Sequence, residues 1–547
     1  MLHKWIEDAK NGKPVWVNEV RETLDREQSG SKVVFELTLF DGGRKTFTHI
    51  FPKWTDKEEK IFASDYLNAV VYNMLCAFGG QKLCCYFDTG DNQLAELFSE
   101  MKKQFMAGEK TRFGYGKILS EADRVCRFLG FGEFRFEERD LAEYQGQQSE
   151  AASAECSGEI KAHSSGSSLK KALISAGETA EKGIRCGIDI GGTDIKVAVS
   201  ENGRLTNIKE YDWNPSVYRT AEETINPIIS LAKEFLKEGC AYSSIGISFP
   251  DVVIRDRILG GETPKTKGLR ESAGDYEHEF AKITALNEKL NQLCTNGGNI
   301  RIINDGNMAA YSAALELAYH GEEAVEKGIL AHSIGTSLGS GWLLPNGKIP
   351  EYTLEMYDFI IDIGSYPERA LGAEDIRCVR NANSGLQGAD RYAGQAAAFR
   401  YAYKLKKELL EAFVSEENGE VHIGNAESDL RKPCLEHLMK CAGDGDKEAQ
   451  QIFRNIGENF ARVSVEMQEL FKAETDVRFV FGRFVKRKKC FDLIREGFES
   501  VLKEIRLVPA DEDMAYSPLM LQLAERKDAT VAQFGQAVGA IYYGAAE

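Results

Sequence analysis

The chain has 547 residues, of which 43% are hydrophobic and 28% charged, a composition typical of a folded globular protein. Its formal net charge of −17 disfavours a nucleic-acid partner, because a polyanion is repelled unless basic residues gather locally. No run reaches the roughly 18–20 uncharged apolar residues of a membrane span, and the charged opening does not suit a signal peptide. We therefore expect a cytoplasmic protein that binds neither membranes nor nucleic acid.

Residues 1–144 predict a small α+β domain. Segments 32–40 and 45–51 alternate apolar and polar residues on either side of an Asp-Gly-Gly turn, which is typical of a β-hairpin. A helical stretch at 64–78, a short strand at 82–87 and a second helical stretch at 93–105 follow. No motif in this domain carries recognisable chemistry, so the sequence leaves its role open.

Residues 145–182 predict a linker, because their small polar side chains bury too little apolar area to offset the entropy cost of ordering. We expect a short helix within it near 169–176. After the linker, strands at 185–190, 194–200 and 204–211 form a meander with a tight Asn202-Gly203 turn. Later strands at 243–249 and 300–304 each follow a helical stretch. This mixture predicts an α/β fold with a mixed sheet.

A second half begins after the helical stretch 307–319, with a strand at 329–335. Near its end, apolar residues recur at three-and-four spacing over about seven turns and predict an amphipathic helix. The apolar positions are Ala449, Ile452, Phe453, Ile456, Phe460, Val463, Met467 and Leu470.

Two glycine-rich turns are the strongest candidates for phosphate binding. The first is Asp189–Thr193 and the second is Gly335–Gly341, each between two predicted strands. Glycine lets a phosphate approach backbone N–H groups, and Thr or Ser hydroxyls add donors. Either turn alone is more often an ordinary hairpin, but two in corresponding halves favour a shared function. The sequence contains no P-loop motif.

Two aspartates stand at strand ends beside these turns. Asp189 could hold Mg²⁺ through water next to a polyphosphate, or could simply begin a hairpin. Asp305 follows the strand 300–304 and begins a helix, so it could be an N-cap or the general base for a hydroxyl nucleophile. The spacing alone does not choose between these roles.

The segments DIGGTDIK, GISFPDVV, INDGNMAA, HSIGTSLGSG and IGENFARVSVEMQELF with VRFVFG resemble, in this order, the signature segments of the ROK family of bacterial sugar kinases. The resemblance covers about residues 183–547. It implies two ribonuclease-H-like lobes around a nucleotide cleft, the actin-like ATPase fold, preceded by the separate α+β domain. The small lobe would span 183–316, completed by about 531–547, and the large lobe 317–530.

The resemblance also implies site residues. The general base would be Asp305, and Asp189 would hold Mg²⁺ through water. The ATP site would comprise Asp189, Gly191, Gly192, Thr193, Lys196, Gly335, Thr336, Gly339 and Gly482. The sugar would contact Asp251, Asn304, Glu355 and Asp358. The implied cofactors are ATP and Mg²⁺, the partners are a small sugar and a nucleotide, and homo-oligomers are common in the family.

Three features depart from the family pattern, and the first comprises two positions. Asp358 stands where the family has a sugar-binding His, and Asp251 stands where a Gly usually follows the Pro of the sugar loop. Extra carboxylates favour other hydroxyl patterns or a cationic amino sugar, because unpaired buried charge is costly. Of the family's zinc cysteines only Cys378 remains, so we expect no zinc site. Finally, Phe481-Gly482-Arg483-Phe484 replaces a Gly-Gly run and could reshape or block the nucleotide pocket.

The sequence thus favours an ATP-dependent kinase of a hexose or amino sugar. The alternative is a non-catalytic sugar or nucleotide sensor with the N-terminal domain as its output. The family includes repressors with a basic helix-turn-helix, but the strand-bearing N-terminal region here does not suit DNA binding.

Overall fold

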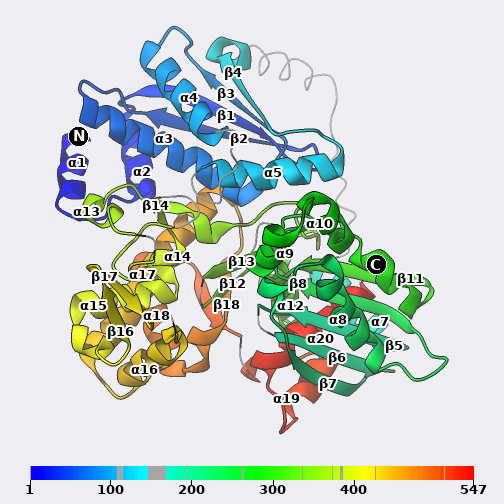
Figure 1. Cartoon of the computed structure of the whole chain (residues 1–547). Coiled ribbons are helices and arrows are strands. Elements are labelled where there is room, and N and C mark those ends of the chain that lie inside the picture. The colour runs from blue at the N-terminus through cyan, green and yellow to red at the C-terminus, as the bar shows by residue number, and fades with distance from the viewer. Residues whose placement is uncertain are drawn as a thin grey trace.

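A computed structural model describes residues 2–106, 115–145, 168–192, 194–261, 264–335, 337–372, 374–381, 386–425, 427–510 and 512–546. Most of the expected linker, together with Thr193 and Thr336, lies outside these residues. Figure 1 shows an N-terminal domain, in blue and cyan, above two further bodies that lie side by side.

The N-terminal domain has a four-stranded sheet in the order β2-β1-β3-β4. The strands are β1 (Ser31–Thr38), β2 (Arg44–Phe51), β3 (Lys82–Phe87) and β4 (Arg135–Asp140), and the helices are α1 (Leu2–Lys10), α2 (Val17–Glu27), α3 (Lys57–Phe78), α4 (Asn92–Phe105) and α5 (Gly116–Leu129). β1 and β2 form the predicted hairpin, with Phe35 opposite Phe47. The expected helices and the third strand are confirmed as α3, α4 and β3.

The small lobe contains a five-stranded sheet in the order β11-β8-β5-β6-β7. Its strands are β5 (Ile184–Ile190), β6 (Asp194–Glu201), β7 (Arg204–Asp212), β8 (Tyr242–Phe249) and β11 (Cys294–Asn304). The central strand β5 is parallel to β8 and antiparallel to β6. The helices α8 (Ala221–Glu234), α9 (Lys267–Ser272), α10 (Tyr276–Thr284) and α11 (Leu286–Leu290) and the short pair β9 (Val253–Ile254) and β10 (Arg257–Ile258) complete it.

The large lobe repeats this arrangement in a sheet of order β13-β12-β18-β19. The strands are β12 (Ile329–Ile334), β13 (Leu338–Leu343), β18 (Val477–Phe481) and β19 (Arg506–Pro509). As in the small lobe, the first strand pairs antiparallel with the next strand of the chain and parallel with a later one. Two lobes with this shared strand order confirm the predicted pair of ribonuclease-H-like lobes.

Two helices, α12 (Asp305–His320) and α20 (Val531–Ala545), share one hydrophobic core with α7 (Leu169–Ala180) and the large-lobe sheet. α20 also lies directly on the small-lobe sheet, because a Cβ on Gly187 of β5 would fall 1.9 Å from the Ala537 carbonyl oxygen. The C-terminal helix therefore completes the small lobe. α7 is the helix expected near 169–176, and its Leu169 and Leu173 are buried.

The rest of the large lobe is largely helical. Its helices are α13 (Tyr366–Arg369), α14 (Asp390–Ala393), α15 (Gln395–Leu405), α16 (Arg431–Gly443), α17 (Lys447–Phe471), α18 (Lys488–Val501) and α19 (Pro518–Ala524), and its small strand pairs are β14 (Ile360–Asp362) with β15 (Gln387–Gly388) and β16 (Val414–Glu417) with β17 (Glu420–Ile423). α17 confirms the predicted amphipathic helix, and every predicted apolar position on it is buried.

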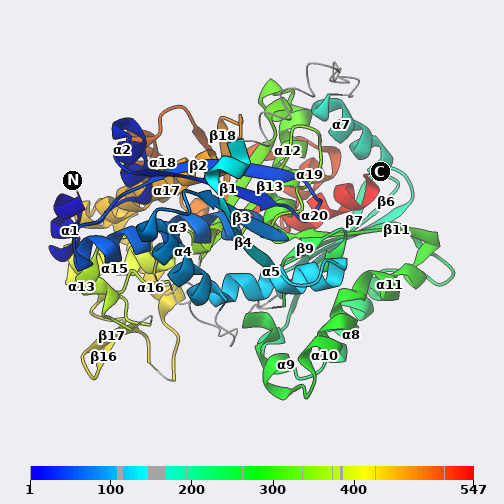
Figure 2. The ribbon, with the colours of Figure 1, turned by 90° about the horizontal axis from the view of Figure 1, so that it is seen from above.

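The N-terminal domain packs on the large lobe with one continuous hydrophobic core. Within that interface Arg21 forms a buried ion pair with Glu466 of α17, and Asn73 of α3 exchanges two hydrogen bonds with the backbone of Ile360, at 2.9 and 2.8 Å. By length and composition α3 could span a membrane, but 83% of its most apolar window is buried here. Seen from above, the N-terminal domain overlies parts of both lobes (Figure 2).

The contact between α17 and α18 gives a test of this packing. A Cβ on Gly457 would lie 1.9 Å from the Ile494 carbonyl oxygen, so Gly457→Ala should lower the free energy of unfolding by about 1–3 kcal/mol. Gly443→Ala is the control, because a Cβ there meets no atom within 4 Å and alanine favours helix. Urea unfolding should show a clear loss for the first variant and none for the second; equal effects would contradict this packing.

Candidate active site

Asp189 lies near the end of β5, the central strand of the small-lobe sheet. In the sheet it stands beside Ser248 of β8, and its side chain is half-buried. Burial raises the pKa of Asp189 to about 6, although the nearby charge of Lys196 opposes this. The carboxylate of Asp305 raises the same pKa further. The two aspartates singled out in the sequence are therefore electrostatic neighbours.

The first glycine turn connects β5 to β6. The Gly191 N–H donates to the Asp194 carbonyl oxygen at 2.8 Å, and Lys196 forms an ion pair with the Asp194 carboxylate. A Cβ on Gly192 would come within 3.7 Å of Cε of Lys265, so this lysine reaches over the turn. Sequence reasoning missed Lys265, which belongs to no recognised motif.

The second turn stands at the equivalent place in the large lobe, between β12 and β13. The Gly335 carbonyl accepts the N–H of Gln395, the first residue of α15, at 2.8 Å. The Ser337 hydroxyl oxygen is buried and has no hydrogen-bond partner among the described residues, so a polar group is free to bind a ligand in this turn. Gly339 pairs with Ser333 across the hairpin.

Gly482 follows β18 and packs against the same turn. Its φ is 94°, and a Cβ there would lie 2.6 Å from the Ile334 carbonyl oxygen. The neighbouring Phe484 is fully buried and meets the ring of Phe453 at 6.1 Å between centroids. The concern that this bulk blocks the nucleotide pocket was therefore wrong for Phe484, which points into the core.

Asp305 is the first residue of α12, while Asn304 is its N-cap. The side-chain oxygen of Asn304 accepts a hydrogen bond from the Gly306 N–H at 2.8 Å. The alternative that Asp305 is the N-cap was therefore wrong. Burial raises the pKa of Asp305, and the charge of Lys265 partly offsets this. Asn304 also donates from Nδ2 to the Asp251 backbone oxygen at 2.9 Å, which joins α12 to the loop that follows β8.

Asp251 is buried and folds back on its own loop. Its carboxylate accepts the N–H groups of Val252 and Gly261 at 2.7 and 2.9 Å. Burial raises the pKa of Asp251 to about 6, and these N–H groups, Lys265 and Arg124 oppose the rise. Arg124 belongs to α5 of the N-terminal domain and pairs with Glu277 of α10 at 3.0 Å. The sequence analysis did not identify Arg124 as a residue near this loop.

Glu355 and Asp358 lie on the large-lobe side. Glu355 is half-buried, and burial raises its pKa to about 7; Lys117 opposes this, while Asp358 and Asp251 add to it. The buried Asp358 accepts a hydrogen bond from the Tyr72 hydroxyl at 3.1 Å and lies 3.9 Å from Nζ of Lys117. Charge coupling therefore links the acids from both lobes to the N-terminal domain.

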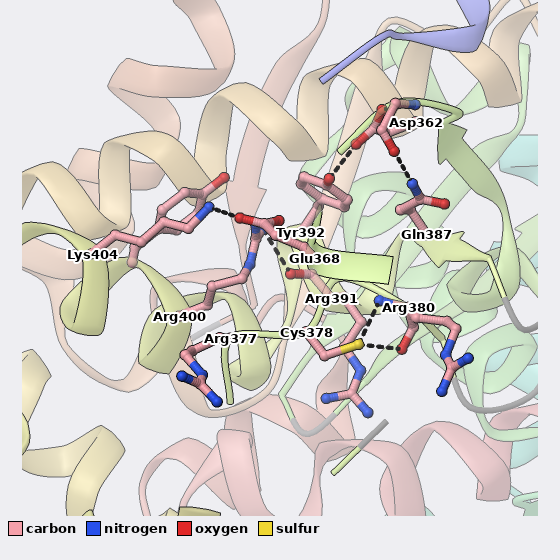
Figure 3. Close-up of polar contacts among 12 residues, drawn as sticks. Asp362, Glu368, Arg377, Cys378, Arg380, Gln387, Arg391, Tyr392, Arg400 and Lys404 are labelled. Atoms are coloured by element: carbon pink, nitrogen blue, oxygen red, sulfur yellow. Dashed lines mark hydrogen bonds and ion pairs between the residues drawn. The ribbon is translucent and has the colours of Figure 1, made fainter. Parts of the chain in front are cut away.

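The segment that the resemblance aligns with the family's zinc site contains a hydrogen-bond network (Figure 3). The Cys378 sulfur accepts the Arg380 N–H at 3.2 Å, and the Tyr392 hydroxyl donates to Asp362. Among the described residues, the one group of His, Cys, Asp and Glu side chains close enough to share a metal is His3, Asp56 and Glu59, in the N-terminal domain. The absence of zinc stays a prediction.

No protein-family model and no curated protein matches the chain. Solved structures similar to it include a ROK-family glucokinase from Streptomyces griseus with glucose and AMPPNP, at 20% identity and a TM-score of 0.42, covering 66% of this chain and 99% of that one. The ROK hexokinase from Thermus thermophilus is 15% identical with a TM-score of 0.41, covering 66% and 97%. A ROK-family transcriptional regulator, a homologue of the E. coli MLC protein, is 14% identical with a TM-score of 0.38, covering 66% and 81%. The strand order described above, rather than these scores, establishes the two-lobe fold.

The raised pKa of Asp189 predicts a stability gain when its charge is removed. The folded protein holds the proton more tightly than the unfolded chain, so its stability falls as the pH rises from about 4 to about 6. Asp189→Asn should therefore stabilise the ligand-free protein by roughly 1–3 kcal/mol at pH 8, and by less at pH 5.

Urea unfolding at the two pH values measures this difference. The control is Asp212→Asn, at the exposed end of β7. Its effect on the free energy of unfolding should be the same at both pH values. A gain that does not depend on pH, or a loss at pH 8, would contradict the assigned environment of Asp189.

Proposed function

We propose that this chain is an ATP- and Mg²⁺-dependent kinase that phosphorylates a hydroxyl group of a hexose or amino sugar. The observation that carries the proposal is that Asp189 and Asp305 lie at the same end of one sheet, at the ends of the two strands that flank β8, and act on each other electrostatically, with a glycine turn on each lobe. A general base, a carboxylate for a hydrated metal and backbone donors for phosphate are the parts that phosphoryl transfer needs. The ordered motifs shared with ROK kinases support the same reaction.

Asp305 accepts the proton of the attacking sugar hydroxyl in this mechanism. Its Oδ1 already accepts the Gly306 N–H at 2.9 Å, so the second oxygen is the one we assign to the substrate. Burial raises its pKa towards neutrality, which improves a carboxylate as a base at physiological pH. The positive charge of Lys265 partly neutralises the Asp305 carboxylate when no substrate is bound.

The nucleotide side is assigned to the two turns. Gly191 and Gly335 shape the turns, because their N–H groups already donate to the Asp194 and Ser337 carbonyl oxygens at 2.8 and 3.0 Å. We assign the Gly192 N–H and the Ser337 hydroxyl to phosphate oxygens, and Lys196 adds positive charge. Asp189 fits a hydrated Mg²⁺, because its desolvated carboxylate lies near a second acid, Asp305, and a cation would stabilise its ionised form. When bound, the metal would neutralise charge on the transferred phosphoryl group.

The acceptor side is assigned to Asn304, Asp251, Glu355 and Asp358. The extra acid Asp358 already has Lys117 and the Tyr72 hydroxyl beside it. Its charge therefore gives no preference for a cationic sugar over a neutral hexose, and we keep both classes. A cytoplasmic location and homo-oligomer formation likewise stay predictions.

A second candidate is a non-catalytic sugar sensor with the N-terminal domain as its output. It is favoured by the backbone hydrogen bond from Glu355 to the Cys76 carbonyl of α3, at 2.8 Å, which would transmit sugar occupancy to that domain. Release of ADP from ATP across a panel of hexoses and amino sugars distinguishes the two candidates.

Asp305→Asn tests the mechanism. The amide cannot accept a proton, so turnover should fall by roughly 10²–10⁴-fold. The N-cap Asn304 is unchanged, and stability should stay within about 1 kcal/mol of the wild type. Sugar and nucleotide binding, measured by calorimetry, should persist.

Asp476→Asn, which removes a surface ion pair with Lys327, is the matched control and should leave turnover unchanged. Equal turnover in Asp305→Asn and the wild type would refute Asp305 as the base. Sugar binding without turnover in either protein would favour the sensor.

A further inference from the structure

The N-terminal domain holds the segment that carries Glu355 and Asp358. The last turn of α3 leaves backbone carbonyls without partners in the helix, and this segment supplies donors for them. The N–H groups of Leu354 and Glu355 donate to the carbonyls of Ala77 and Cys76 at 3.1 and 2.8 Å, and the Thr353 hydroxyl donates to Cys76 at 2.7 Å. Leu354 has a φ of 56°, a left-handed conformation that these contacts maintain.

A lysine of the same domain contacts the far end of the segment. Nζ of Lys117, on the first turn of α5, donates to the Tyr357 hydroxyl at 3.1 Å and lies 3.9 Å from Oδ2 of Asp358. The Lys117 residue is only 8% exposed. The Tyr72 hydroxyl of α3 donates to the same carboxylate oxygen, so Asp358 is held from two helices of the N-terminal domain.

The groups around Lys117 are mostly acidic. On the large-lobe segment it faces Glu355, Asp358 and Tyr357; on its own helix it faces Glu121, and on α3 Cys76. Asp251 of the small lobe acts on Glu355 from the other side. Two neighbouring carboxylates in a desolvated site repel one another, and a cation placed between helix and segment allows both to be ionised together.

We propose that Lys117 is a positioning residue for the acceptor pocket, so that the N-terminal domain forms one wall of the sugar site. It orients Glu355 and Asp358 as acceptors for sugar hydroxyls, and its charge favours the ionised forms of both acids, without taking part in phosphoryl transfer. This inference rests on the proposed function, because it takes Glu355 and Asp358 as sugar ligands. It also gives the N-terminal domain a role in substrate recognition rather than only in output.

The full-length chain carrying Lys117→Met, Lys117→Gln or Lys117→Arg tests the proposal. Titration calorimetry with glucose, mannose, galactose and their 2-amino derivatives measures sugar binding, and ADP release gives kcat and the KM values for sugar and ATP. We expect Lys117→Met and Lys117→Gln to weaken sugar binding and raise its KM about 10- to 100-fold, with kcat and the KM for ATP changed less than about threefold. Lys117→Arg restores the charge and should restore most of the affinity.

The pH profile separates positioning from a purely structural ion pair. Without the cation, the pKa of the pair Glu355 and Asp358 rises. If sugar binding strengthens as this pair ionises, the midpoint pH of that change should be higher in Lys117→Met and Lys117→Gln than in the wild type. In Lys117→Arg it should return to the wild-type value. Lys60→Met is the matched control: Lys60 of α3 pairs with Glu96 and Glu100 of α4 and should leave sugar binding and its pH profile unchanged.

The outcomes distinguish failure of the inference about Lys117 from failure of the proposed function. If the wild type binds a sugar and the charge-removing variants bind it equally, with the same pH midpoint, the inference is overturned and the proposed function stands. If the wild type neither binds nor phosphorylates any sugar of the panel, the proposed function falls and the inference with it. If Lys117→Met does not fold, Lys117→Gln, which keeps a polar contact to Tyr357, supplies the same comparison.

Discussion

The concentration of acidic groups where the two lobes and the N-terminal domain approach one another is the constraint on which the rest of this structure depends. Carboxylates approach it from both lobes: Asp189, Asp251, Asp305, Glu355 and Asp358. Their mutual repulsion and loss of water raise the pKa of several of them, and such a cluster is tolerated only where cations and N–H donors surround it. The fold supplies Lys196 and Lys265 from the small lobe and Lys117 from the N-terminal domain.

The N-terminal domain contacts both lobes beside these acids. α5 contacts the large lobe through Lys117 and the small lobe through Arg124, which pairs with Glu277 and lies 5.1 Å from the ring centre of Tyr276. α3 meanwhile binds the backbone of the segment containing Glu355. A movement of one lobe against the other must therefore break or strain the contacts of the N-terminal domain with at least one of them.

Much of the fold could be predicted from the sequence because local patterns determine it. Period-two alternation and glycine turns located β1, β5 and β12, and three-and-four spacing located α17. The sequence placed Asp189 and Asp305 at strand ends, but only the resemblance to ROK kinases implied that they share a site; in the structure they are electrostatic neighbours. The resemblance to ROK kinases added the acceptor residues, whose roles stay predictions.

What the sequence could not predict are contacts between distant elements. Lys117 meets a segment 240 residues further along the chain, and neither α5 nor that segment carries a motif that announces the pairing. The direction of a side chain could not be predicted either. Phe484 lies two residues after Gly482 in the sequence, yet its side chain packs into the core. The N-cap of α12 could not be chosen from the sequence, because Asn and Asp are both good N-caps, and the structure has Asn304 in that position.

Hydrogen exchange of the full-length chain tests the central claim, that the cleft is one site built from both lobes and the N-terminal domain. Amide exchange would be compared with and without a non-hydrolysable ATP analogue and a mixture of hexoses and 2-amino hexoses. We predict slower exchange, together, in peptides covering Asp189–Lys196, Asn304–Met308, Gly335–Ser340 and Thr353–Asp358, and in the end of α3 that binds the last of these. Protection confined to other segments, or none at saturating ligand, would contradict the account.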